Sequence, residues 1–80
     1  MKKTYIHISV TNYSHHMVEP SVHYYFSDGE HPATSRHDLS PACAKNMMWK
    51  LIKLGGESSY HSNPFNPAIS VREVTFWGQL

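Results

Sequence analysis

The first clear pattern in the chain is an alternation of apolar and polar residues in the segment TYIHISVTNY, which begins at Thr4. Ile6, Ile8 and Val10 share one side of this pattern, and the residues between them are polar or aromatic. A period of two is typical of a strand with one buried face. The segment SVHYYF, which begins at Ser21, repeats the alternation. We therefore expect two strands in the N-terminal third of the chain.

The apolar sides of these two strands match in one antiparallel register. Paired apolar and aromatic side chains on neighbouring strands stabilise a sheet, and a slip of one residue would turn them to the wrong face. The predicted pairs are Ile6 with Phe26, Ile8 with Tyr24 and Val10 with Val22. The pattern predicts a hairpin connected by YSHHMVEP, with Pro20 at the start or edge of the second strand because proline cannot donate a ladder hydrogen bond.

A loop and then a helix are predicted next. The segment 27–38 contains Gly, Pro, Ser and Asp without periodicity, which predicts an exposed loop. Ser40 is suited to cap a helix, and Pro41 suits its first position, where a missing N–H costs nothing. Gly55 and Gly56 predict the end of the helix, because glycine accepts the left-handed conformation of a C-terminal cap.

Two further strands are predicted after the helix. ESSYHS is a candidate short strand, and NPFNP predicts a turn that Phe65 anchors on the core. The last strand is AISVREVTFW, in which the apolar phase shifts midway. This shift predicts either a bulge near Arg72 and Glu73 or a strand with partial cover on both faces.

These elements predict an α+β fold in β-β-α-β-β order, formed by residues 1–80 as a single small domain. The simplest arrangement is an antiparallel sheet with one helix packed on one face. The other face then stays open, and its predicted side chains are those of Tyr5, His7, Ser9, Thr11, His23 and Tyr25.

The helix segment KNMMWKLIK has an unusual position for its largest residue. On a helical wheel, the apolar residues gather in one arc, while Trp49 falls on the polar side with Lys45, Lys53 and Lys50. We predict that these four residues, the Trp49 stripe, form a binding surface, because tryptophan is common at binding hot spots and lysines attract carboxylates or phosphates. The alternative is that a loop or the C-terminal tail, including Trp77, covers the indole.

Length and composition narrow the class of protein. Eighty residues, 40% hydrophobic and 12% aromatic, are typical of one globular domain with a small core, which dimerisation would help to stabilise. The formal net charge of +1 excludes the strong basic excess of duplex-binding domains and the acidity of nucleic-acid mimics.

The ends of the chain and its cysteine content predict a compartment. Cys43 is the only cysteine, which excludes an internal disulfide and a zinc site built on cysteine pairs and fits a reducing compartment. The start MKKTYIHISV lacks the apolar core of a signal peptide, and no apolar run is long enough to span a bilayer. We expect a cytoplasmic protein with no membrane partner, encoded by a complete small open reading frame.

The histidines and the cysteine raise the possibility of metal or thiol chemistry. His31, His37 and Cys43 are near one another in sequence, and His15 and His16 are adjacent, but their spacing matches no zinc template. Cys43 near a helix N-terminus could be activated by a histidine, although a small residue at the core margin is the simpler interpretation. No spacing of carboxylates suggests acid–base catalysis. We expect no enzyme activity, catalytic residue, metal ligand or cofactor.

The sequence therefore favours a small non-enzymatic bacterial or phage protein that acts through contacts with another protein, with a homodimer as one form. An inhibitor or accessory protein of a mobile element is one such role. The candidate surfaces are the Trp49 stripe and the open sheet face around Tyr5, His7, His23 and Tyr25. The alternatives are a nucleic-acid-binding module using Trp49 and the helix lysines, and a His/Cys metal-binding protein.

Overall fold

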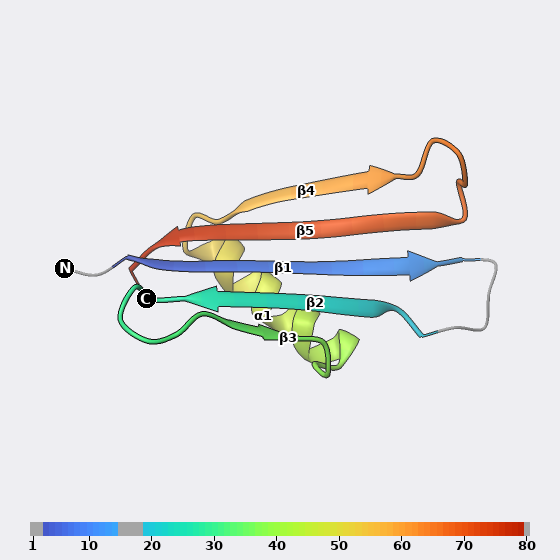
Figure 1. The fold of residues 1–80 in the computed structure, drawn as a ribbon. Helices are drawn as coiled ribbons and strands as arrows, with labels where there is room; N and C mark the ends of the chain where they lie inside the picture. Colours follow the sequence, from blue (N-terminus) through green and yellow to red (C-terminus); the bar gives the residue numbers. More distant parts are fainter. Residues whose placement is uncertain (1–2, 15–18, 80) are drawn as a thin grey trace.

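The computed structural model describes residues 3–14 and 19–79, which form one five-stranded antiparallel sheet and one helix (Figure 1). In chain order the elements are β1 (Thr4–Tyr13), β2 (Ser21–Ser27), β3 (Thr34–Arg36), α1 (Pro41–Lys53), β4 (Glu57–Ser62) and β5 (Ile69–Gly78). The strands lie side by side in the order β3-β2-β1-β5-β4, so the first strand is central. The α+β class and the antiparallel sheet with one helix are confirmed, and β3 is an additional strand.

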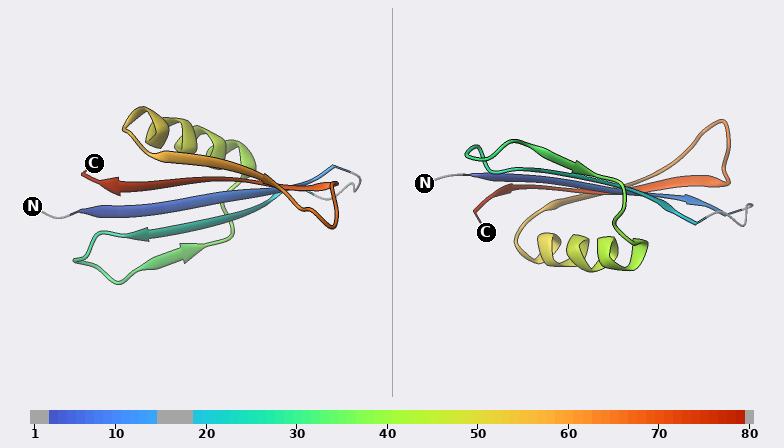
Figure 2. Two further views of the ribbon diagram at one scale, coloured as in Figure 1. Left: turned by 90° about the horizontal axis from the view of Figure 1, so that it is seen from above. Right: turned by 60° about the horizontal axis from the view of Figure 1, so that its bottom comes forward.

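The helix lies across one face of the sheet, and the opposite face carries no helix (Figure 2). The far ends of β1, β4 and β5 extend past the helix, which gives the molecule its elongated shape of 45 × 23 × 21 Å. Within the described residues, no helix is long and apolar enough to cross a membrane.

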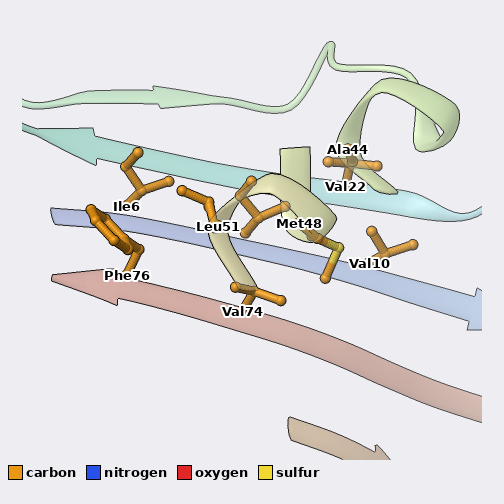
Figure 3. Close-up of a cluster of buried hydrophobic side chains, with 9 residues drawn as sticks. Ile6, Val10, Val22, Ala44, Met48, Leu51, Val74 and Phe76 are labelled. Atoms are coloured by element: carbon orange, nitrogen blue, oxygen red, sulfur yellow. The ribbon is translucent and has the colours of Figure 1, made fainter. Parts of the chain in front are cut away.

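The core is the contact between α1 and the three middle strands (Figure 3). Its deepest residues are Ile8, Val10 and Val74, whose side chains are almost completely buried. The whole cluster comprises Ile6, Ile8 and Val10 of β1, Val22 of β2, Val74 and Phe76 of β5, and Ala44, Met48 and Leu51 of α1. All six residues of β4 are exposed, so this outer strand lies beyond the cover of the helix.

The strand registers decide between the alternatives left by the sequence. The predicted pairing of β1 with β2 is confirmed, including Ile8 opposite Tyr24. The pairing of β1 with β5 continues without interruption from Thr4 and Gly78 to Tyr13 and Ile69, so β5 has no bulge. The apolar phase of β5 shifts because only the part near its C-terminus lies over the helix, while its first residues extend beyond it.

Both predicted ends of the helix are confirmed. The Ser40 hydroxyl accepts a hydrogen bond from the backbone N–H of Cys43 at 3.2 Å, and Pro41 occupies the first turn. Gly55 has φ of +99°, and the N–H of Gly56 donates to the Leu51 carbonyl at 2.8 Å. These bonds satisfy backbone groups that a helix end leaves unpaired.

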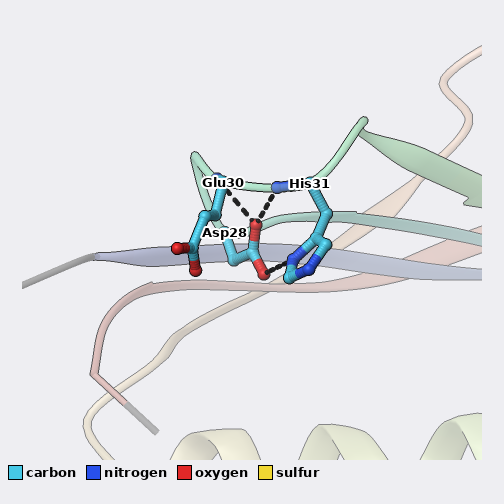
Figure 4. Close-up of polar contacts among 3 residues, drawn as sticks. All are labelled: Asp28, Glu30 and His31. Atoms are coloured by element: carbon cyan, nitrogen blue, oxygen red, sulfur yellow. Dashed lines mark hydrogen bonds and ion pairs between the residues drawn. The ribbon is translucent and has the colours of Figure 1, made fainter.

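The prediction of a loop throughout residues 27–38 is wrong, because Thr34–Arg36 form β3. A tight turn around Asp28 makes this strand possible (Figure 4). One carboxylate oxygen of Asp28 accepts the backbone N–H groups of Glu30 and His31 at 2.9 and 2.8 Å, and the other lies 2.7 Å from Nδ1 of His31. These hydrogen bonds hold the pKa of Asp28 well below its usual range.

An ion pair joins the last residue of β3 to the chain that follows it. Nε of Arg36 donates to Asp38 at 3.0 Å, and this hydrogen bond lowers the pKa of the Asp38 carboxyl. Both side chains are exposed, so the pair joins neighbouring residues at the surface.

Phe65 does not anchor the turn between β4 and β5, and this prediction is wrong. Its side chain is 96% exposed. The Asn63 side chain builds the turn instead, accepting the backbone N–H groups of Phe65 and Asn66 at 2.8 and 3.1 Å. Because the turn lies beyond the helix, there is no core beneath it for a phenyl ring.

A buried and an exposed phenylalanine, Phe76 and Phe65, allow a matched test of this core. Phe76→Ala should lower the free energy of unfolding by about 3 to 5 kcal/mol, because it removes a buried ring. Phe65→Ala should change it by less than about 0.5 kcal/mol, because that ring is in water. Urea denaturation of both variants measures the difference, and equal losses would contradict the described core.

The Asp28 turn predicts a specific response to acid. Its pKa is lower in the folded chain than in the unfolded chain, so the unfolded chain binds the proton more tightly. The stabilisation by Asp28 is therefore complete above the unfolded pKa of about 4 and is lost as the pH falls below it. Asp28→Asn keeps an oxygen acceptor but removes the titration. Urea midpoints between about pH 5 and pH 2 should fall less steeply for this variant, and parallel curves would count against the turn.

Candidate functional site

A hollow of about 290 Å³ lies between α1 and the outer half of the sheet. Its lining residues are Lys45, Met48, Trp49 and Ile52 of α1 and Arg72 of β5. The four helix residues have the spacing of one flank of a helix, since residues three, four and seven apart lie close together on its surface. We name this site the Trp49 hollow.

Arg72 reaches the hollow because of its position in β5. It is paired with Val10, whose side chain is buried under the helix, so both residues lie on the helix side of the sheet. On its other side Arg72 is paired with Tyr60 of β4, and its guanidinium lies 5.4 Å from the centre of the tyrosine ring. This cation–π contact holds the positive charge at the margin of the hollow.

The hollow combines exposed aromatic rings with unpaired positive charge. Trp49 is 62% exposed at its rim, and the neighbouring Tyr60 is 59% exposed. In the described part of the chain neither Lys45 nor Arg72 forms an ion pair, and no carboxylate is among the lining residues. A site of this kind can accept an apolar group against Met48 and an anionic group beside it.

The three lysines of the predicted Trp49 stripe do not lie on one flank of α1. Lys45 lines the Trp49 hollow, whereas Lys50 lines a second hollow on the opposite flank with Met47 and Leu54. Lys53 is exposed in the last turn. The structure therefore brings Trp49 together with Lys45 and not with Lys50.

The indole of Trp49 is not covered by Trp77. Trp77 is paired with Tyr5, and its ring lies edge-on to that of Tyr5, with centroids 5.6 Å apart. Tyr5 alternates with the buried Thr4 and Ile6, so this contact lies on the face away from the helix. Trp49 and Trp77 are thus on opposite faces of the sheet.

The open sheet face carries an aromatic row. Tyr25, Tyr5 and Trp77 come from three neighbouring strands, with ring centroids 5.8 and 5.6 Å apart in edge-to-face geometry. The ammonium of Lys3 lies 6.0 Å from the Trp77 ring. Edge-to-face aromatic pairs attract each other more strongly than their buried area alone would predict. The row is therefore a preformed surface.

A second row, of imidazoles, crosses the same face. The rings of His37 and His23 lie 4.9 Å apart, and those of His23 and His7 lie 6.2 Å apart. The Glu73 carboxylate continues the row, with one oxygen 3.4 Å from Nε2 of His7 and the other 3.5 Å from Nε2 of His61. The sequence placed His7 and His23 on this face but did not identify the other three.

Among the described residues considered for a metal site, His31, His37 and Cys43 do not meet one another. In residues 3–14 and 19–79, no group of three or more His, Cys, Asp or Glu side chains is arranged to hold a metal ion. His31 contacts Asp28, and His37 contacts His23 on the open face. Cys43 is exposed on the helix, on the other side of the sheet. His15 and His16 lie outside the described residues.

Sequence reasoning missed Arg72, which lines the hollow, and Tyr60, which contacts Arg72 beside it. A signal for Arg72 was present, since it alternates with Val74 and Phe76 and thus occupies the core-facing phase of β5. Tyr60 gave no such signal, because its contact with Arg72 depends on how β4 pairs with β5.

The charge of the hollow can be measured through the indole itself. In a Trp77→Phe background, we expect the ratio of iodide quenching to caesium quenching to be higher for Trp49 than for a free indole, because Lys45 and Arg72 concentrate anions near the ring. Adding Arg72→Gln should lower the ratio of iodide quenching to caesium quenching. A ratio equal to that of a free indole, and unaffected by Arg72→Gln, would contradict a positive hollow.

No family model, curated protein or solved structure matches this chain. Its function is therefore inferred from the Trp49 hollow and the open sheet face.

Proposed function

We propose that the chain is a binding protein and not an enzyme, and that its Trp49 hollow captures a segment of a partner protein. The recognised segment carries an apolar side chain next to a carboxylate. The observation that carries this proposal is the meeting of Trp49, Lys45 and Arg72 at one hollow whose lining includes no carboxylate. Capture of this kind is the mode of action of a small inhibitor or accessory protein.

The size and composition of the hollow support a peptide segment. Its volume of about 290 Å³ is at the lower limit of small-molecule pockets, which suits one or two side chains of a larger partner. Met48 and Ile52 offer an apolar floor, and exposed tryptophans are frequent hot spots of protein interfaces. Lys45 and Arg72 would attract an acidic partner and orient it.

The nucleic-acid alternative has weaker support. Binding along a phosphate backbone draws on several cations that can reach one strand. Lys45 and Lys50 lie on opposite flanks of α1, and the formal net charge of the chain is only +1. This arrangement of positive charges suits a compact anionic group better than the continuous phosphate backbone of a nucleic acid.

Selection from a displayed library of random peptides against the immobilised full chain tests the proposal. We expect the selected peptides to combine Asp or Glu with a large apolar residue. Trp49→Ala and Arg72→Gln should each weaken a selected peptide by about tenfold or more, which corresponds to about 1.4 kcal/mol at a hot spot. Fluorescence anisotropy of the labelled peptide measures the affinity.

Trp77→Ala is a matched control, because Trp77 is also 62% exposed but lies on the other face. It should leave the peptide affinity unchanged. Equal affinity of wild type and Trp49→Ala for the selected peptide would contradict the proposal. Retention on single-stranded oligonucleotides with a steep salt dependence, lost in Trp49→Ala, would favour the nucleic-acid alternative instead.

A further inference from the structure

One edge of the sheet is long and uncovered. β4 is the outermost strand beside β5, and all six of its residues are exposed. The opposite edge, β3, has only three residues. An edge strand presents unpaired backbone N–H and C=O groups, and these form a template for another strand. At about 3.4 Å per residue, β4 offers a template about 20 Å long.

Apart from the charge of Glu57 at its first position, the β4 edge lacks the features that usually prevent pairing. Between Glu57 and Ser62 there is no lysine, arginine or proline. The register with β5 is unbroken from Glu57 opposite Thr75 to Ser62 opposite Ser70, so no bulge bends the strand away. Charged edge residues, prolines and bulges are the common protections of such edges. β4 is therefore open to a further strand.

The residues of β4 are complementary to those of a second, antiparallel β4. If Ser59 lies opposite Ser59 of the second copy, His61 of each copy lies opposite Glu57 of the other. The imidazole of His61 can then meet the carboxylate of Glu57, and polar pairs of this kind at facing positions stabilise an antiparallel pair. On the helix side, the large ring of Tyr60 then lies opposite the small side chain of Ser58. This fit favours a second copy of the chain over an unrelated strand.

We propose that two copies of the chain pair through β4 in this register and form one continuous ten-stranded sheet. The symmetry axis is perpendicular to the sheet, because facing residues of paired strands must lie on the same face. Each α1 lies on one face of its own sheet (Figure 2). Both helices consequently lie on one side of the joint sheet.

The dimer would join two sites into one groove. Between the helices, the floor consists of β5 and β4 of each copy, and the two β5 strands are about 14 Å apart at the usual strand spacing. Tyr60 and Arg72 of each copy lie in this floor, and Trp49 stands at each margin. The groove thus suits an extended acidic segment that reaches both hollows. This use of the groove rests on the proposed function, whereas the pairing of β4 does not.

Charge substitutions at Ser59 test the register, because this residue faces itself in the dimer. The full chain should form dimers in sedimentation equilibrium without any added partner. Ser59→Lys and Ser59→Asp should each raise the dissociation constant about three- to tenfold, because like charges then face each other. An equal mixture of the two variants should regain the affinity of the wild type or exceed it.

Ser35→Lys is the control, because Ser35 is exposed on the opposite edge strand. It should leave association unchanged, and far-UV circular dichroism confirms that each variant is folded. A wild type that stays monomeric at about millimolar concentration would overturn the proposal. A dimer whose dissociation constant does not change with the Ser59 substitutions would also overturn it, because the contact would then lie on another surface. Capture of acidic peptides by a monomer would leave the proposed function intact while removing the dimer.

Discussion

The packing of α1 against the three middle strands is the interaction on which the rest of the structure depends. A helix of 13 residues is about 20 Å long, while β1 and β5, with ten residues each, extend for about 33 Å. The helix can therefore bury only the central part of one face. The ends of β1 and β5 beyond the helix result from this mismatch of lengths. One helix is also narrower than five strands, which leaves β4 bare and a hollow beside the helix, and the opposite face of the sheet has no helix to cover it.

Local patterns predicted most of the fold because neighbouring residues determine them. The helix ends depend on Ser40 and Gly55, and the first hairpin on an alternation that fits one register. The strand β3 was missed because its three residues carry no pattern of their own and pair only through the turn made by Asp28. Phe65 was misplaced because an apolar residue in a turn does not reveal whether a core lies beneath it.

The candidate site was only partly predictable, since its members come from different elements. A helical wheel identified Trp49 as an outward residue, but the same wheel could not tell which flank faces β5. That information comes from the tertiary packing, which separates Lys45 from Lys50. The imidazole row likewise joins residues of distant strands, and only the sheet order brings Glu73 between His7 and His61.

Arg72 occupies a position where stability alone would favour an apolar residue. It faces the helix side opposite Val10, which is 1% exposed. A large apolar side chain buried there would contribute about 1.5 to 3 kcal/mol, whereas an exposed cation–π contact such as that with Tyr60 contributes about 0.5 to 1 kcal/mol. An apolar residue would also extend the core into the hollow and remove its charge. Departures from the local pattern without a gain in stability are expected at functional sites, so the position of Arg72 supports the proposed binding role of the hollow.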